Sequence, residues 1–452
     1  RDFRREQSEW GLLEGILANR ENQLFFLWKS SVPGSFAPDS LFYTAVQAWS
    51  NQGYDVSVAM DLLPAADAAV EKREWGELER LTGLLLQALF SADRDPDHIA
   101  SRFRLPAAWH DISASFPEDT WNMGCAPEER LKRIHAGWLG QICGGAYGTA
   151  IEGYTGYNLR KAFGERLGGY ISEPETWNDD ITFEIALLSA IERLEKGKEL
   201  TSQLIAEEWL RLIYFGWSAE YCALENLRRG IFPPDSGSFR NPYSEWIGAQ
   251  MRTMACGLLV PGDPLGAAKI AWQDSRVSHT GNGIYGGIHS AVLTSLSFCI
   301  DNPRELLHAS REYIPEKTMY RYFFDLAMET AEQSTDHLSA WDKLEPHIRI
   351  FHWIHAIPNM AAVVLALYYC EHEMGRAFRI LGECGLDVDC NAGEVGTVLG
   401  VMQGSVPEAW GGPIGDELNT YVPGYEQMSI TQLAEWTQGL GENLRNEPQR
   451  RR

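Results

Sequence analysis

The chain has 452 residues, which is enough for one large domain or for a domain with a substantial extension, and 44% of the residues are hydrophobic. Its formal net charge of −23 repels phosphate backbones, so nucleic acid is excluded as an expected partner. No apolar run reaches the roughly 18 to 20 residues that a membrane-spanning helix requires, and we expect no membrane association.

The eight cysteines of the chain show no CxxC spacing. This distribution argues against a disulfide framework and against a zinc ribbon, and it favours mostly reduced thiols in a cytoplasmic protein. Residue 1 is Arg rather than Met. We therefore expect the native start to lie upstream, and a removed signal peptide remains an alternative to the cytoplasmic assignment.

Residues 1–125 are predicted to form an N-terminal helical extension in which Pro- and Asp-rich loops join the helices. In the segment 75–92, leucines recur at the spacing of one helical face, at Leu78, Leu81, Leu84, Leu85 and Leu89. This part of the chain shows no pattern of catalytic residues. Its role stays open between a lid, a dimerisation element and a recognition extension, and the sequence makes no prediction of the oligomeric state.

Residues 126–440 are predicted to form one helical domain, and a polar, basic tail follows at 441–452. The segment 128–152 is rich in Gly and Ala, which suits close contact between helices. Further helices are expected at 180–196, 201–216, 218–229, 243–258, 264–274, 283–299, 320–332, 359–371 and 391–403. The only short extended candidate is "GGYIS" (168–172). The predicted fold class is therefore all-α, with many helices rather than a simple bundle.

The first candidate site is "NDD", where Asn178, Asp179 and Asp180 precede an apolar helical stripe. Helix capping is one interpretation, because Asn and Asp are preferred N-caps and acids favour the positive end of a helix. One cap residue would satisfy that need, however. The second carboxylate makes a metal site the alternative interpretation.

The second candidate site is "DVDC", where Asp387, Asp389 and Cys390 precede a helix with glycines at 393, 396, 400 and 404. Glycine costs about 1 kcal/mol in a helix interior, so these glycines predict another backbone close to this face. If both Asp-rich helix starts converge, their buried anions require a cation. Carboxylate oxygens are the ligands that Mg²⁺ prefers.

The remaining candidates lie in or next to two Gly-rich segments. Glu152 follows the glycines at 144–148 and taken alone would be a surface glutamate. In "RVSHTGNGIYGGIHSA" (276–291), His279 precedes a Gly-rich turn, and it is structural or substrate-facing rather than a zinc ligand, because no second His or Cys stands at ligand spacing.

The ordered set of motifs resembles the ADP-ribosylglycohydrolase family, in particular a bacterial branch of it, over roughly residues 128–440. The resemblance rests on "IHAGWLGQICGGAYGTAIEG", then "NDD", then "NPYSEWIGAQMRTMACGLLVPGDPLGAAKIAWQDSRVSHTGNGIYGG", and finally "DVDCNAGEVGTVLGVMQG". It implies a compact all-α fold with a two-magnesium centre. The metal ligands that it implies are Asn178, Asp179, Asp180, Asp387, Asp389 and Cys390.

Cys390 stands where many relatives have Thr or Ser, and Asn178 where many have Thr. Because a thiol is a poor ligand for Mg²⁺, the centre would be looser, hold one metal, or prefer Mn²⁺. The resemblance further implies a hydrolase that cleaves a ribosyl bond of a small-molecule or protein-linked ADP-ribosyl substrate, with Asp180 or Glu152 as the general base.

The Gly-rich turns are candidates for donating backbone N–H groups to a diphosphate. The substrate-binding residues expected on this basis are Glu152, Gly148, His279, Asn282, Gly283 and Tyr285. Two alternatives remain open. One is a glycosidase of a free nucleoside or small ribosylated metabolite, and the other is a non-catalytic protein that binds ADP-ribose.

Overall fold

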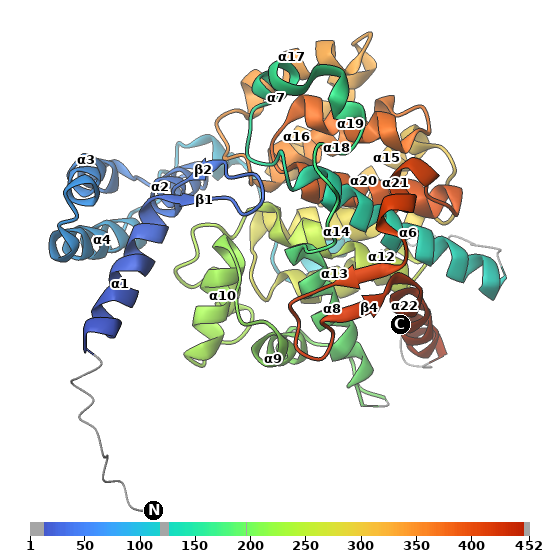
Figure 1. Cartoon of the computed structure of the whole chain (residues 1–452), viewed down its shortest axis with the longest axis horizontal. Coiled ribbons are helices and arrows are strands. Elements are labelled where there is room, and N and C mark those ends of the chain that lie inside the picture. Colours follow the sequence, from blue (N-terminus) through green and yellow to red (C-terminus); the bar gives the residue numbers. More distant parts are fainter. Residues whose placement is uncertain (1–12, 118–125, 196, 447–452) are drawn as a thin grey trace, which may run out of the picture. The chain divides into compact units, whose positions relative to one another are not determined.

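The computed structural model describes residues 13–117, 126–195 and 197–446 (Figure 1). The chain divides into two compact units, Arg1–Ser101 and Arg102–Arg452. In the described part of the chain nearly all regular structure is helical, so the predicted all-α class is confirmed. No described helix combines the length and the hydropathy that crossing a membrane requires.

The first unit is a small helical array with one short hairpin. Its elements are α1 (Leu13–Trp28), β1 (Ser30–Ser31), β2 (Pro38–Asp39), α2 (Leu41–Asn51), α3 (Ser57–Lys72), α4 (Trp75–Phe90) and the 3₁₀ helix η2 (Ile99–Arg102). The hairpin is antiparallel, with Ser30 opposite Asp39. The leucine stripe predicted for α4 is buried except at Leu84, which is 38% exposed.

The second unit contains the remaining helices. They are α5 (Trp109–Ile112), η3 (Ser113–Ser115), α6 (Pro127–Gly148), α7 (Gly156–Phe163), η4 (Gly164–Gly168), α8 (Asp179–Glu192), α9 (Ser202–Leu212), α10 (Ser218–Arg228), α11 (Asp235–Ser238), η5 (Ile247–Arg252), α12 (Met254–Leu259), α13 (Pro264–Ser275), α14 (Gly281–Leu296), α15 (Pro303–Arg311), α16 (Met319–Glu332), α17 (His337–Ile348), α18 (Ala356–Tyr369), α19 (Met374–Cys384), α20 (Val388–Gln403), α21 (Glu408–Ile414) and α22 (Ile430–Asn446).

One hairpin interrupts the helices near the end of this unit. Strands β3 (Glu417–Asn419) and β4 (Gln427–Ser429) pair antiparallel, with Leu418 opposite Met428. Helix α22 continues from β4 into the segment predicted as a polar tail, and residues 447–452 lie outside the described residues.

Two expectations about local structure are wrong. The extended segment 168–172 instead ends the 3₁₀ helix η4 and continues as bends, and it pairs with no strand in the described chain. The single helix expected at 243–258 is divided into η5 and α12. The backbone N–H of Ile247 donates to the carbonyl of Ile354 at 2.8 Å, and this contact with another segment takes the place of a regular helical start.

Helices α6 and α20 lie side by side and form the centre of the second unit (Figure 1). A methyl group on Gly140 would come within 2.1 Å of the carbonyl oxygen of Gly396, so the two backbones are in direct contact. The close approach predicted from the glycines is confirmed at Gly396 and Gly400. Gly404 has another role, because it ends α20 with a φ of +62°.

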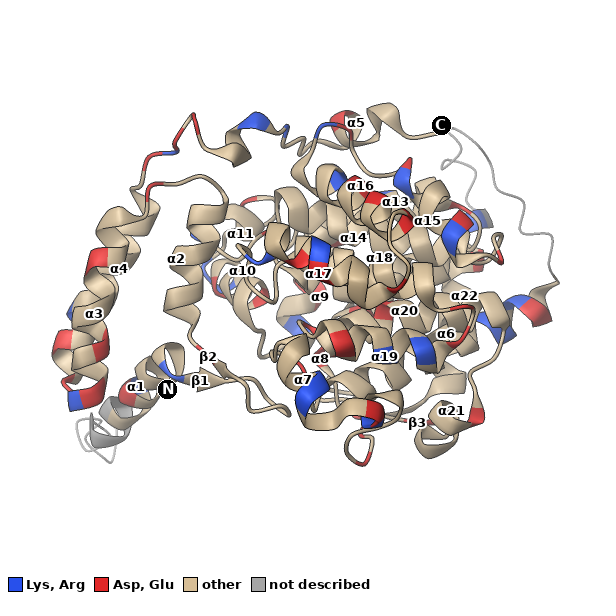
Figure 2. Ribbon diagram, turned by 90° about the horizontal axis from the view of Figure 1, so that it is seen from above, with Lys and Arg blue, Asp and Glu red and all other residues tan. Residues whose placement is uncertain are grey.

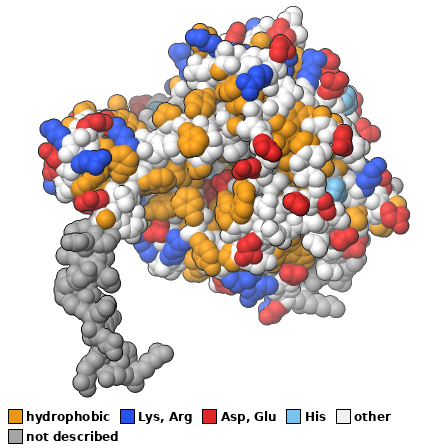
Figure 3. Space-filling model, in the orientation of Figure 1, with side chains coloured by type: hydrophobic (Ala, Val, Ile, Leu, Met, Phe, Trp, Pro, Cys, Tyr) orange, Lys and Arg blue, Asp and Glu red, His pale blue; other side chains and the backbone are white. Residues whose placement is uncertain are grey.

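Acidic residues occur on segments inside this helical array as well as at its surface (Figure 2). The surface drawn in Figure 3 mixes charged side chains of both signs with exposed hydrophobic side chains. A buried carboxylate is costly unless a cation or hydrogen bonds compensate it, so the buried acids of this unit are candidates for binding a cation.

Candidate metal centre

The first Asp-rich helix start is capped by its asparagine alone. Asn178 has an extended backbone, and its side-chain oxygen accepts the N–H of Asp180 at 2.7 Å. Its side-chain nitrogen donates to an oxygen of Asp389 at 3.3 Å. Because Asn178 meets the capping need of α8, the carboxylates of Asp179 and Asp180 are not required as caps.

The second helix start has an acid at the cap position that does not cap. Asp387 is the N-cap of α20, but its side chain forms no capping hydrogen bond. The preceding residue, Leu386, has a φ of +75°, which is rare for a residue with a side chain. This turn therefore depends on other contacts for its conformation.

Asn359, a fully buried residue of α18, supplies the first of these contacts. Its side-chain oxygen accepts the backbone N–H of Asp387 at 3.2 Å and the amide of Asn391 at 2.7 Å. Its side-chain nitrogen donates to the carbonyls of Trp353 at 2.7 Å and His355 at 3.0 Å. Sequence reasoning missed Asn359, although a lone amide in the apolar segment 356–369 was a signal that could have found it.

The loop after α6 supplies the second contact. The N–H of Gly153 donates to the carbonyl of Leu386 at 2.9 Å, and the N–H of Leu386 donates to the carbonyl of Tyr154 at 3.3 Å. Helix α6 itself ends directly on α20, because a methyl group on Gly148 would lie 2.1 Å from the backbone nitrogen of Asp389. These contacts hold Glu152, which is half-buried, beside the start of α20.

The two helix starts converge. Oxygen and sulfur atoms of Asp387, Asp389 and Cys390 lie within 4.8 Å of one another. The Cys390 thiol donates to an oxygen of Asp180 at 3.5 Å, which joins α20 to α8. Residues that are about 200 positions apart in the chain therefore form one acidic cluster, and we call Glu152, Asp179, Asp180, Asp387 and Asp389 the acid centre.

The electrostatics of the acid centre are those of crowded anions. Burial raises the pKa of Glu152 well above its ordinary value, and the charges of Asp389, Asp387 and Asp179 add to this effect. Burial and the charge of Asp389 raise the pKa of Asp179 to about 6. Within the described residues, the Oδ1 atom of Asp387 is buried without a hydrogen-bond partner. Buried carboxylates with a free oxygen are suited to a divalent cation.

Cys390 differs from the acids in its chemistry. Burial raises the pKa of its thiol well above the ordinary value, and the charge of Asp180 adds to this effect. Its sulfur also lies 3.9 Å from that of Met251. A protonated thiol donates a hydrogen bond to Asp180, so Cys390 contributes a contact between helices even if it binds no ion.

The residues expected from the second Gly-rich segment make contacts elsewhere in the protein. The Asn282 side-chain oxygen accepts the N–H of Tyr320 at 3.0 Å, and the Tyr285 hydroxyl donates to the carbonyl of Pro106 at 2.8 Å. The N–H groups of Asn282 and Gly283 donate to Glu245 and Thr280 at 3.2 and 3.0 Å. These backbone donors are therefore already used within the protein.

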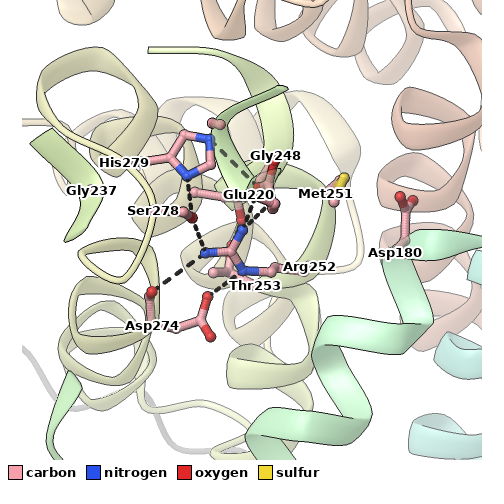
Figure 4. Close-up of polar contacts among 12 residues, drawn as sticks. Asp180, Glu220, Gly237, Gly248, Met251, Arg252, Thr253, Asp274, Ser278 and His279 are labelled. Carbon is pink, nitrogen blue, oxygen red and sulfur yellow. Dashed lines mark hydrogen bonds and ion pairs between the residues drawn. The ribbon is translucent and has the colours of Figure 1, made fainter. Parts of the chain in front are cut away.

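His279 belongs to a buried ion-pair network around Arg252 (Figure 4). Arg252 donates to Asp274 at 2.6 Å and to Glu220 at 2.8 Å. It also donates to the Ser278 hydroxyl, which lies 2.7 Å from the Nδ1 atom of His279. Asp180 lies outside this network (Figure 4). Sequence reasoning missed Arg252, and its single positive charge in the hydrophobic segment 247–260 was the available signal.

Comparison with known proteins gives one family. The model of the ADP-ribosylglycohydrolase family matches residues 126–450, a range that includes both Asp-rich helix starts. A solved structure described as an ADP-ribosylglycohydrolase-related protein complex is 19% identical, with a TM-score of 0.48, and the alignment covers 70% of this chain and 98% of that one. No curated protein matches the chain.

Proposed function

The chain belongs to the ADP-ribosylglycohydrolase family, and from that premise we propose that it is a metal-dependent hydrolase of a ribosyl glycosidic bond. Its substrate would be an ADP-ribosylated molecule or a metabolite that contains ADP-ribose. The observation that supports this function is the convergence of two Asp-rich helix starts, with Asn178 3.3 Å from Asp389 and Cys390 3.5 Å from Asp180.

Asp179, Asp180, Asp387 and Asp389 would hold Mg²⁺, with two ions as the expected number and Mn²⁺ as the alternative if Cys390 takes part. When bound, the metal would supply positive charge that binds ribose hydroxyls and polarises a water molecule. The unpartnered Oδ1 of Asp387 supports this assignment, because a buried carboxylate oxygen without a donor is suited to binding a cation.

The acids also suit the reaction itself. Hydrolysis breaks the bond between the anomeric carbon and the leaving atom, and the electron pair of that bond goes to the leaving atom. The oxygen of water then bonds to the anomeric carbon, and one proton of water passes to a base. Positive charge develops on the ribose in the transition state, and the carboxylates of the acid centre would stabilise it.

Glu152 is the proposed general base. It is half-buried on the loop after α6, whereas Asp180 is only 2% exposed and accepts a hydrogen bond from the Cys390 thiol. A base must reach both a water molecule and the substrate, and the more accessible of the two carboxylates meets this requirement better. Asp180 is then assigned to holding the metal.

Neutralising single acids tests the proposal. Asp180→Asn and Asp389→Asn should abolish turnover of ADP-ribosyl-arginine, ADP-ribosyl-serine or O-acetyl-ADP-ribose in the presence of Mg²⁺, with unchanged circular dichroism. The matched control is Asp336→Asn, which removes charge from the N-cap of α17 but leaves an amide able to accept the N–H of Ser339. Full turnover in the two acid-centre variants contradicts the proposal.

A further inference from the structure

Two sulfur atoms lie in contact at the edge of the acid centre. The Sγ atom of Cys390 lies 3.9 Å from the Sδ atom of Met251 and 3.5 Å from the Oδ1 atom of Asp180. Cys390 and Met251 are both buried. A buried contact between Cys and Met is ordinary packing on its own, because both side chains behave as hydrophobic groups in a protein core. This contact differs because carboxylate oxygens lie next to it.

A carboxylate oxygen without a partner belongs to the same cluster. Donor atoms of Cys390, Asp387 and Asp389 all lie within 4.8 Å of one another. The Oδ1 atom of Asp387 is buried and, among the described residues, accepts no hydrogen bond. One oxygen of Asp389, in contrast, accepts the backbone N–H of Cys390 at 2.9 Å. Asp387 and Cys390 therefore lie close enough to bind the same ion, and Asp387 has an oxygen available for it.

The buried network around Arg252 fixes the position of the thioether. Arg252 directly follows Met251, and it donates to Asp274 at 2.6 Å and to Glu220 at 2.8 Å. Figure 4 shows Met251 between this network and Asp180. Because its neighbour in the chain is held by these ion pairs, the sulfur of Met251 is placed beside the acid centre before an ion binds.

Sulfur and oxygen donors select different cations. Mg²⁺ prefers oxygen ligands, whereas thiolate and thioether sulfur suit softer ions. Zn²⁺ accepts thiolate sulfur together with carboxylate oxygen, usually in a shell of four ligands. Cys390 and Met251 offer sulfur, and Asp180 and Asp387 offer oxygen next to it. This part of the acid centre therefore has a donor set that suits Zn²⁺ better than Mg²⁺.

The distances also fit a tetrahedral ion. With Zn–S bonds of about 2.3 Å and Zn–O bonds of about 2.1 Å, two sulfur ligands lie about 3.8 Å apart, and a sulfur and an oxygen ligand lie about 3.6 Å apart. The observed separations from the Cys390 sulfur are 3.9 Å to Met251 and 3.5 Å to Asp180. These three donor atoms therefore need little movement to bind one ion.

We propose that the acid centre has two unequal metal positions, and that the position beside Cys390 and Met251 binds a thiophilic divalent cation such as Zn²⁺. Its ligands would be Cys390, Asp180 and Asp387, with the Met251 thioether as the fourth. The inference rests on the proposed function, because the remaining acids would hold Mg²⁺ in the other position. On binding, a bond forms between the ion and the Cys390 sulfur, and the thiol proton passes to solvent.

The test uses Co²⁺ as a probe for Zn²⁺, because coordination of a thiolate to Co²⁺ gives an intense charge-transfer band in the near ultraviolet. The full chain is freed of metal with EDTA and titrated with Co²⁺. We expect the band to appear in wild type and to disappear when Zn²⁺ is added.

Two variants assign the band to its sulfur ligands. Cys390→Ser keeps a hydroxyl oxygen in place of sulfur. It should lack the band and bind Zn²⁺ at least about tenfold more weakly, while its Mg²⁺ affinity should not fall. Met251→Leu should keep the band and lose a smaller part of the Zn²⁺ affinity. The wild-type band and Met251→Leu decide the question even where Cys390→Ser does not fold.

Two matched variants control for the other sulfur atoms of the chain. Cys370→Ser removes a buried thiol that donates to the carbonyl of Leu367 at 3.3 Å, a hydrogen bond that a serine hydroxyl keeps. Met254→Leu removes a buried thioether that accepts the Thr397 hydroxyl at 3.5 Å. Both variants should keep the band and the wild-type affinity for Zn²⁺.

The two readouts separate the possible failures. Absence of the band in wild type, or an equal band in Cys390→Ser, overturns the inference, and Mg²⁺-dependent turnover of an ADP-ribosyl substrate would still support the proposed function. A band that depends on Cys390, in a protein that hydrolyses no ADP-ribosyl substrate with Mg²⁺, Zn²⁺ or both, overturns the proposed function and supports the thiophilic metal position.

Discussion

Gly148 and Asp389 are in direct backbone contact, since a methyl group on Gly148 would lie 2.1 Å from the Asp389 nitrogen. This contact places the end of α6 against the start of α20. Because the loop after α6 contains Glu152, the absence of a side chain at one position allows an acid from each helix to enter the same cluster.

Gly148→Ala should therefore disturb the acid centre. The methyl group must push α6 away from α20, and overpacking of this kind costs about 1–3 kcal/mol of unfolding free energy. We also expect weaker binding of Mg²⁺, because Glu152 and Asp389 move apart. Urea unfolding measures the first effect, and calorimetric titration with Mg²⁺ measures the second.

Gly439→Ala is the matched control for this substitution. Gly439 lies within α22, and a methyl group there would meet nothing within 4 Å. Alanine in a helix interior should stabilise the protein by about 0.5–1 kcal/mol and leave the Mg²⁺ affinity unchanged. Wild-type Mg²⁺ affinity in Gly148→Ala would show that the helix contact is not needed for the site.

Asn359→Leu should weaken metal binding although Asn359 is not an acid. The substitution removes all four hydrogen bonds of the amide, including the one from the N–H of Asp387, and leaves buried groups unsatisfied. Each such group costs about 1–3 kcal/mol. The turn at Leu386 and Asp387 then loses its support, and calorimetry should record a lower Mg²⁺ affinity.

Asn226→Leu separates this positioning effect from general instability. Asn226 is also buried, and its amide donates to the carbonyls of Ser236 and Phe239. We expect a comparable loss of stability in urea but an unchanged affinity for Mg²⁺. If both variants lose affinity to the same extent, Asn359 has no specific effect on the metal centre.

Asp387→Asn and Asp274→Asn should change stability in opposite directions when Mg²⁺ is removed with EDTA. Burial raises the pKa of Asp387, and the charge of Asp389 adds to this effect, so losing the charge of Asp387 should raise the melting temperature. Asp274 is buried against Arg252, and breaking such a pair should cost about 3–5 kcal/mol. Differential scanning calorimetry measures both changes.

Adding Mg²⁺ to the same two variants completes the comparison. Binding to the folded state raises its melting temperature, so the increase reports the affinity of the site. We expect a much smaller increase for Asp387→Asn than for wild type and an unchanged increase for Asp274→Asn. An unchanged increase in both variants would remove Asp387 from the metal ligands.

The sequence predicted the acidic residues of the site, but it did not predict the buried residues that hold the surrounding segments in place. Both Asp-rich helix starts could be found because carboxylates at a helix start form a local pattern. Asn359 and Arg252 have no such pattern, since their partners lie in other segments and become neighbours only in the folded chain. Most predicted helices are present in the structure, because helical periodicity is also a local property of the sequence.

The glycines of α20 show the limit of a local pattern. Gly396 contacts the backbone of Gly140, but Gly404 ends the helix, and a methyl group on Gly393 would make only ordinary contacts. These glycines follow one another at intervals of three or four residues, which all suit one helical face, so spacing alone could not separate close packing from a helix end. The distinction comes from α6, whose position is set by tertiary contacts.

His289 should make the protein sensitive to acid. Burial, and then the charge of Arg321, lower the pKa of its imidazole from 6.5 to about 3. The unfolded chain therefore binds a proton below about pH 6.5 that the folded chain does not. Stability is complete above that pH and falls as the pH decreases toward 3, by at most about 1.4 kcal/mol per pH unit from this residue.

His289→Gln should remove this part of the acid sensitivity. The variant loses contacts with Tyr320 and Ser310 and should be less stable than wild type at pH 7.5, but its urea stability should decline less steeply between pH 6.5 and 4.5. His110→Gln is the control, because that side chain is 82% exposed and should leave the slope unchanged. Equal slopes for wild type and His289→Gln would contradict this prediction. They would mean that the buried imidazole takes up its proton in the folded protein.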